Sequence, residues 1–304
     1  MSRFTSTAVT VGLTLTLAAC SGEDDPVAGI PAFPVDEPAI TVVETGDDAR
    51  VLSYADIADE PWSTTIAVSS GTAQQVGDDV SGGDVAITTL PLDISVAEAP
   101  VPEDGEADAS RRIDFTVGSG KHSDLDIGQD VAASEGFRMS WRADDTGRIS
   151  TLKLLAPADA PQRGLQLVEP TLITLINNSV VFPDEPIGPG ATWTVESRVA
   201  GDTSMTRTTT YTLLSREGDT LTLDTKVEER PQNNTLTIDS PGELEGESVQ
   251  VDSSRTTSEG QIVVDLHRPL PVSGQTAWTT RLIYGGDDKA RVVQDITRAV
   301  QFGV

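Results

Sequence analysis

Cysteine and histidine are almost absent from this chain of 304 residues, which contains one cysteine and two histidines. A lone cysteine excludes an internal disulfide. A Ser-His-Asp hydrolase needs a serine beside an oriented histidine, and the chain has no Gly-x-Ser-x-Gly sequence that would present one to His122 or His267. Because no catalytic signature stands out, we expect no enzymatic activity and no cofactor.

Basic residues are also few: the chain has 21 Lys and Arg against 48 Asp and Glu, a net charge of −27. Nucleic acids are bound by basic patches, so we expect no nucleic-acid partner. Anionic lipid headgroups would repel the same surface, so a basic face is not expected to hold the protein on a membrane. We interpret the acidic surface as a source of solubility and of spacing from a negative envelope, with cation binding as the alternative.

Hydrophobic stretches are short. Ala8–Leu17, which follows Arg3, would span about 15 Å as a helix, about half a bilayer core. That is too short for a transmembrane helix and typical of the apolar part of a signal peptide. The next residues, Leu17-Ala18-Ala19-Cys20, resemble the lipobox of bacterial lipoprotein precursors, in which small residues fit the peptidase and the cysteine takes diacylglycerol as a thioether.

This resemblance implies that residues 1–19 are a signal peptide that is removed, and that Cys20 carries diacylglycerol, often with a further N-acyl chain. One acyl chain anchors a protein marginally, whereas two or more hold it firmly. We therefore expect an extracytoplasmic protein, anchored to the outer face of the cell membrane by lipid on Cys20. The alternative is an ordinary secretory signal followed by a chance cysteine.

The rest of the chain divides into a tether and a folded part. Residues 20–38 are acidic and proline-rich, which predicts a tether. Residues 39–304 predict a single β-rich domain, with two similar halves, 39–160 and 181–304, around one helix as the alternative. Short β-branched runs predict strands in the first half. They are Ile40–Glu44, Arg50–Tyr54, Thr64–Ser69, Val85–Leu90, Leu92–Ala97, Arg111–Val117, Gly136–Arg142 and Ile149–Leu155.

One segment departs from the β pattern. In Gln162–Val180 the apolar residues recur at spacings of three and four, which predicts an amphipathic helix of about four turns. Pro170 lies inside this segment, so a kink or a late start near Glu169-Pro170 is expected.

The last third of the chain predicts hairpins of long strands. They are Thr206–Ser215 with Thr220–Glu229, Ser248–Thr257 with Gln261–His267, and Thr276–Tyr284 with Ala290–Gln301. Period-two alternation places Leu221, Leu223, Thr225 and Val227 on one face. The predicted fold class is therefore mainly β (α+β), with curved antiparallel meander sheets, half-barrel or barrel-like, packed on one amphipathic helix near 162–180.

The spacing of Asp124, Asp126 and Glu135, with Asp130 between them, resembles a calcium-binding EF-hand loop and makes Asp124, Asp126 and Asp130 candidate metal ligands. The glycine falls at the fifth position, Gly128, and Gln129 stands at the sixth, where the EF-hand has its glycine. With 48 acidic residues in the chain, a solvated loop is the other interpretation.

The segment Phe182–Trp193 reads Phe-Pro-x-x-Pro-Ile-Gly-x-Gly-x-x-Trp. This pattern resembles an uncharacterised family of bacterial secreted lipoproteins, in which an acidic tether precedes a strand-rich domain with a helix before the motif. The family has no assigned activity, so the resemblance supplies no catalytic residues. It implies a structural role, as a rigid link from helix to strand, for Pro183, Pro186, Gly188, Gly190 and Trp193.

A long curved meander facing one apolar helix favours a ligand-binding function. Our leading hypothesis is a non-enzymatic envelope lipoprotein whose domain binds a hydrophobic or glycolipid ligand, by fold-level analogy with envelope lipoproteins that carry lipids. It requires a cavity of at least about 300 Å³. The alternative is a scaffold or adaptor that binds another envelope protein. We expect the tryptophans at 62, 141, 193 and 278 to fill the core rather than to line a cavity.

Overall fold

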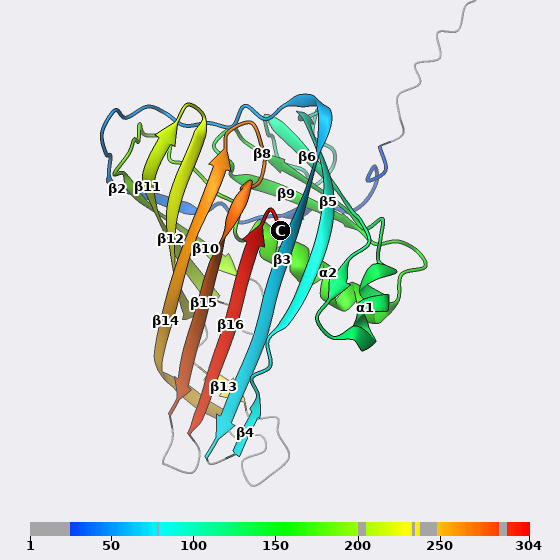
Figure 1. The fold of residues 1–304 in the computed structure, drawn as a ribbon, viewed down its shortest axis with the longest axis vertical. Coiled ribbons are helices and arrows are strands. Elements are labelled where there is room, and N and C mark those ends of the chain that lie inside the picture. Colours follow the sequence, from blue (N-terminus) through cyan, green and yellow to red (C-terminus); the bar gives the residue numbers. More distant parts are fainter. Residues whose placement is uncertain (1–24, 78, 200–204, 233–234, 238–247, 286–290) are drawn as a thin grey trace, which may run out of the picture.

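The computed structural model describes residues 25–77, 79–199, 205–232, 235–237, 248–285 and 291–304. These residues form a mainly β protein, an open curved antiparallel sheet with two helices, which confirms the predicted fold class (Figure 1). The strands are β1 (Phe33–Pro34), β2 (Ala39–Glu44), β3 (Ala58–Val76), β4 (Asp79–Gly82), β5 (Ala86–Glu98), β6 (Arg111–Val117), β7 (Lys121–His122), β8 (Arg138–Ala143), β9 (Ile149–Leu155), β10 (Thr192–Val199), β11 (Met205–Glu217), β12 (Thr220–Pro231), β13 (Thr235–Thr237), β14 (Ser248–Asp265), β15 (Ser273–Tyr284) and β16 (Val292–Phe302). The helices are α1 (Leu125–Ala132) and α2 (Gln162–Ile176).

The sheet has two ends that are close in sequence. Its strand order is β1-β9-β8-β6-β5-β3-β16-β15-β14-β12-β11-β10-β2, and the short strands β4, β7 and β13 pair with β3, β5 and β14. Strand β16 pairs with β3 from Val292↔Val76 to Phe302↔Ile66, so the two halves of the chain share one sheet. Because β1 and β2 follow one another, the residues between them run from one end of the sheet to the other. We call residues 33–38 the strap.

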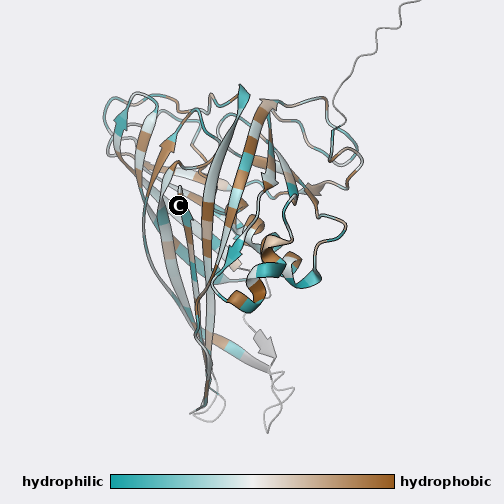
Figure 2. Cartoon of the chain, turned by 45° about the vertical axis from the view of Figure 1, so that its right-hand side comes forward, coloured by the Kyte–Doolittle hydropathy of each residue, from teal (hydrophilic) through white to brown (hydrophobic). Residues whose placement is uncertain are grey.

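Several long strands bury one face, as the burial patterns of β5 and β12 show. Apolar and polar residues alternate along the long strands (Figure 2). On β12 the residues Leu221, Leu223, Thr225 and Val227 are all at most 4% exposed, which confirms the shared face predicted for them. The main core contains residues from both halves of the sheet and from α2, as expected when a curved sheet must cover its apolar face.

Helix α2 packs into this core between strands β9 and β10. Its residues Val168, Leu172 and Leu175 are completely buried. The helix begins at Gln162, so the late start expected at Pro170 is wrong; Pro170 lies inside the helix. The Thr171 hydroxyl donates to the Leu167 carbonyl at 2.7 Å, as threonine hydroxyls often do within helices.

Two predicted local structures are wrong for identifiable reasons. No turn interrupts β14 at residues 258–260, so the hairpin predicted there does not form. Gly260 instead permits close approach between strands, because a Cβ there would lie 2.1 Å from the Thr225 hydroxyl oxygen. The segment Arg50–Tyr54 is not a strand, since its backbone bonds go to separate elements: Arg50 pairs with Ile187, and the Tyr54 N–H donates to the Asp145 carbonyl at 2.7 Å.

The predicted tether is ordered over much of its length. Asp25 accepts hydrogen bonds from the Arg112 guanidinium at 2.6 and 2.7 Å, and this contact holds the pKa of Asp25 below its usual value. Val27 is buried, and β1 pairs with β9. From Asp25 onward the acidic segment is therefore part of the folded domain. Arg112 on β6 forms an ion pair with Asp25, and β1 pairs with β9.

The segment 182–193 connects α2 to β10. Trp193 is fully buried, and its indole N–H donates to the Val181 carbonyl at 3.0 Å. Gly190 has a φ of +90°, a conformation that favours glycine. Pro183 is buried and Pro186 is exposed.

Gly188 provides the most direct test of this link. A Cβ on Gly188 would lie 1.8 Å from the Asp47 carbonyl oxygen, so the two backbones could not stay in place. We predict that Gly188→Ala lowers the free energy of unfolding by about 2 kcal/mol or more, measured by urea denaturation. The control is Gly128→Ala in α1, where the nearest atom is 3.9 Å away; it should be neutral or stabilise by up to about 1 kcal/mol. Equal stabilities of the two variants would contradict the close approach.

Candidate ligand pocket

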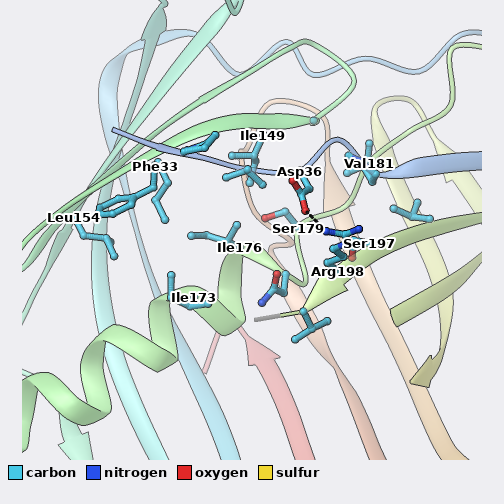
Figure 3. A pocket seen from close by; sticks show the side chains of 18 of the residues that line it. Phe33, Asp36, Ile149, Leu154, Ile173, Ile176, Ser179, Val181, Ser197 and Arg198 are labelled. Atoms are coloured by element: carbon cyan, nitrogen blue, oxygen red, sulfur yellow. Dashed lines mark ion pairs between the residues drawn. The ribbon is translucent and has the colours of Figure 1, made fainter. Parts of the chain in front are cut away.

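A pocket of about 560 Å³ lies where the two ends of the sheet come near each other. The strap crosses it, α2 forms its floor, and strands β9 and β10 form its sides (Figure 3). Its lining residues are Phe33, Pro34, Val35, Asp36, Pro38, Gly147, Ile149, Leu152, Leu154, Glu169, Ile173, Ile176, Asn177, Ser179, Val181, Val195, Ser197, Arg198, Val199 and Gln232. Most of these are apolar, as is usual for pockets that bind small organic ligands.

A bulge aligns the apolar side chains of β9. The register shifts between Arg142 and Ala143 on β8, where Arg142 pairs with Thr151 and Ala143 with Ile149. Ser150 is therefore the extra residue of a β-bulge. Odd-numbered residues before it and even-numbered residues after it point to the same side of β9. As a result Ile149, Leu152 and Leu154 all line the pocket.

Helix α2 divides its apolar residues between core and pocket. The completely buried positions face the sheet, whereas Ile173 and Ile176 are half-buried and line the pocket. Phe33 on the strap is 53% exposed and lies on the opposite wall. The helix thus has a packed face and a second apolar face that the domain leaves partly uncovered.

Polar groups gather on the β10 side of the pocket. Arg198 on β10 and Asp36 on the strap form an ion pair at 3.9 Å, with both side chains 73% exposed. Asn177 and Ser197 also line the pocket, and within the described residues neither side chain makes a hydrogen bond to the protein. An exposed ion pair at this distance contributes little to stability, so these four side chains are available to a ligand.

A buried ionic network holds the C-terminus of α2, next to the pocket. The guanidinium of Arg207 donates to Glu229 Oε1 at 2.8 and 3.1 Å, and the Thr280 hydroxyl donates to Glu229 Oε2 at 2.8 Å. Arg207 also donates to the carbonyl of Asn177, the residue that caps the C-terminus of α2, at 3.3 Å. A cation is favourable at that end of a helix, so the network fixes where α2 ends and therefore where Asn177 lies.

The predicted metal residues do not form a metal site. Asp124 caps the N-terminus of α1, accepting a hydrogen bond from the Asp126 N–H at 2.9 Å, and Asp130 lies 3.8 Å from Arg163. No group of three or more potential metal ligands occurs within the described ranges. The acidic spacing that resembles an EF-hand is instead a helix with a capping aspartate and an acidic first turn, both of which favour a helix start.

The tryptophans and His122 lie within the described structure, and Cys20 lies outside it. Trp141, Trp193 and Trp278 are at most 3% exposed and Trp62 packs partly buried against the core, so core packing is confirmed. His122 accepts a hydrogen bond from the Asp124 N–H at 3.1 Å. Neither described helix has the length and hydropathy needed to cross a bilayer.

The sequence does not reveal the pocket. Ile173 and Ile176 belong to the apolar pattern of the helix, and their spacing does not distinguish residues that face a core from residues that face a cavity. Phe33 and Asp36 lie in the segment predicted as a tether, where a lone aromatic among acidic residues and prolines was the available signal.

Comparison with protein families gives a match to part of the chain. A family of unknown function, DUF6263, matches residues 174–268, from the last turn of α2 to the end of β14 and just beyond. This range includes the Phe182–Trp193 motif and the pocket residues of β10. No curated protein matches the chain.

His267 supplies a pH-dependent contact at the rim of the sheet. Its ring bonds the Ala55 carbonyl through Nδ1 at 2.9 Å and faces Asp219 through Nε2 at 3.3 Å. The bond to Ala55 and then that to Asp219 raise the pKa of His267. Because the folded pKa is above the unfolded value, its stabilisation is complete below the unfolded pKa of about 6.5 and is lost as the pH rises through the folded value.

We predict that His267→Gln lowers the Tm at about pH 5.5 and has less effect at about pH 8.5. Differential scanning fluorimetry at both pH values measures this, with Lys121→Gln, at an exposed position of β7, as the control. An equal decrease in Tm at both pH values would show that the contact does not depend on protonation of His267.

Proposed function

We propose that this protein is a non-enzymatic envelope lipoprotein that holds a hydrophobic or glycolipid ligand in the pocket between β9, α2 and β10. The observation that carries the proposal is the pocket itself, at about 560 Å³ with a largely apolar lining. Binding sites for small organic ligands usually measure about 300 to 1,000 Å³. The hydrophobic effect would favour an apolar ligand there, because Phe33, Ile173 and Ile176 are otherwise partly exposed to water.

The packing around the pocket supports a built cavity. Leu172 and Leu175 are completely buried in the core beneath it, whereas Ile173 and Ile176 on the second face of the same helix are half-buried and line the pocket. The strap supplies a wall: it begins with β1, which pairs with β9, and leads into β2, which pairs with β10. An apolar ligand would fill the space between the strap and α2, since protein interiors are otherwise close-packed.

The lipobox-like sequence places the domain close to the membrane in this proposal. If Cys20 carries lipid, five peptide units separate it from Asp25, and these can span at most about 18 Å. Asp25 is held on β6 by Arg112, and the strap follows eight residues later. The domain would therefore sit near the bilayer rather than at the end of a long tether, with its strap on the anchored side of the chain. A partner protein in the envelope remains an outcome that the experiments below can reveal.

Filling the pocket tests ligand binding. We predict that Ile173→Trp reduces the lipid that co-purifies with protein expressed in its native envelope by about tenfold or more, measured by mass spectrometry of the extract. The matched control is Leu125→Trp, which adds the same side chain at a position in α1 that is 86% exposed. The control should retain the lipid of the wild type. Absence of lipid from wild-type protein, with a co-purifying protein instead, would contradict the proposal and favour an adaptor.

Replacing the cysteine tests the anchor. We predict that Cys20→Ala abolishes incorporation of an alkyne-labelled palmitate and moves the protein from the membrane fraction to the soluble fraction. Ser21→Ala, at the next position, should behave as the wild type. Retention of the label by Cys20→Ala would show that lipid is attached elsewhere or that the lipobox-like sequence is fortuitous.

A further inference from the structure

We propose that the ligand is an amphiphile with an uncharged, hydroxyl-bearing head group, such as a glycerol or a sugar, whose head lies at the β10 side of the pocket. This inference rests on the proposed function and names the class of ligand. It follows from the uneven distribution of polar groups around the pocket.

The β9 side of the pocket is suited to an acyl chain. Leu152 and Leu154 on β9 face Phe33 on the strap and Ile173 on the helix. In Figure 3 Phe33, Leu154 and Ile173 lie together on one side of the cavity, away from the charged residues. A hydrocarbon chain there would bury these side chains and leave no polar group of its own unpaired.

The β10 side is suited to a polar head. Asn177 and Ser197 provide an amide and a hydroxyl that make no hydrogen bond to the described protein, and Ser197 lies beside Arg198 in Figure 3. Asn177 follows Ile173 by one helical turn, about 6 Å along the axis. Head and tail contacts are thus separated by a distance that one amphiphilic molecule can span.

The charges favour a neutral head. The lining contains two carboxylates, Asp36 and Glu169, and one guanidinium, Arg198, in a chain of net charge −27. An anionic head would gain Arg198 but would face Asp36 across the 3.9 Å ion pair. A cationic head would gain Asp36 and be repelled by Arg198. A hydroxyl both donates and accepts, so it can bond to Arg198 and Asp36 together without displacing either.

Three probes with the same acyl chain separate these cases: lauroylglycerol, laurate and lauroylcholine, which have neutral, anionic and cationic heads. Binding to the full chain is measured by isothermal titration calorimetry below the micelle concentration of each probe. We expect lauroylglycerol to bind about tenfold more tightly than either charged probe, since two or more head-group hydrogen bonds distinguish it. Tighter binding of laurate or lauroylcholine would overturn the inference.

A variant tests the assignment of the head-group site. Ser197→Ala should weaken lauroylglycerol binding about fivefold, through loss of one hydrogen bond, and leave laurate binding unchanged. Ser81→Ala on the exposed strand β4 is the control, and an unchanged Tm verifies that both variants fold. Equal binding of all three probes, with no effect of Ser197→Ala, would overturn the head-group assignment and leave the proposed function standing. Failure of all three to bind the wild type would overturn both.

Discussion

The fold depends on the position of α2 against the curved sheet, near strands β9 and β10, whose outer edges pair with the short strands β1 and β2. Strands β9 and β10 are consecutive in the chain, but a helix with its side chains is about 10 Å wide, roughly twice the spacing of paired strands. Val168, Leu172 and Leu175 of α2 are completely buried in the core, while Ile173 and Ile176 line the pocket together with residues of β9 and β10. The sheet is open between its two ends, and the pocket lies there beside the helix.

The strap and the buried ion pair complete this arrangement from opposite sides. The strap joins the two ends of the sheet across the opening, while Arg207 and Glu229 fix the C-terminus of the helix from within. A buried pair of this kind contributes little net stability, because both charges must leave water. Its value is positional: it determines where α2 ends, and therefore which of its residues face the cavity.

Much of the fold could be predicted from the sequence because alternation and turn residues are local signals. The single buried face of β12 and the helix near 162–180 are of this kind. The errors arose where one residue type serves two purposes: Gly260 signals a turn but allows close packing, and Asp124 signals a metal loop but caps a helix. The pocket could not be predicted, since Phe33, Ile173 and Ser197 come together only through the pairing of strands that are distant in sequence.

The central claim is that the opening between β9 and β10 is a ligand site rather than a packing defect. A crystal structure of protein purified from its native envelope, without added lipid, tests it most directly. Elongated electron density between α2 and the strap, along Leu154 and Ile173, is the result that the account predicts. A structure in which β9, the strap and β10 have closed onto α2, with their side chains filling the space, would contradict it.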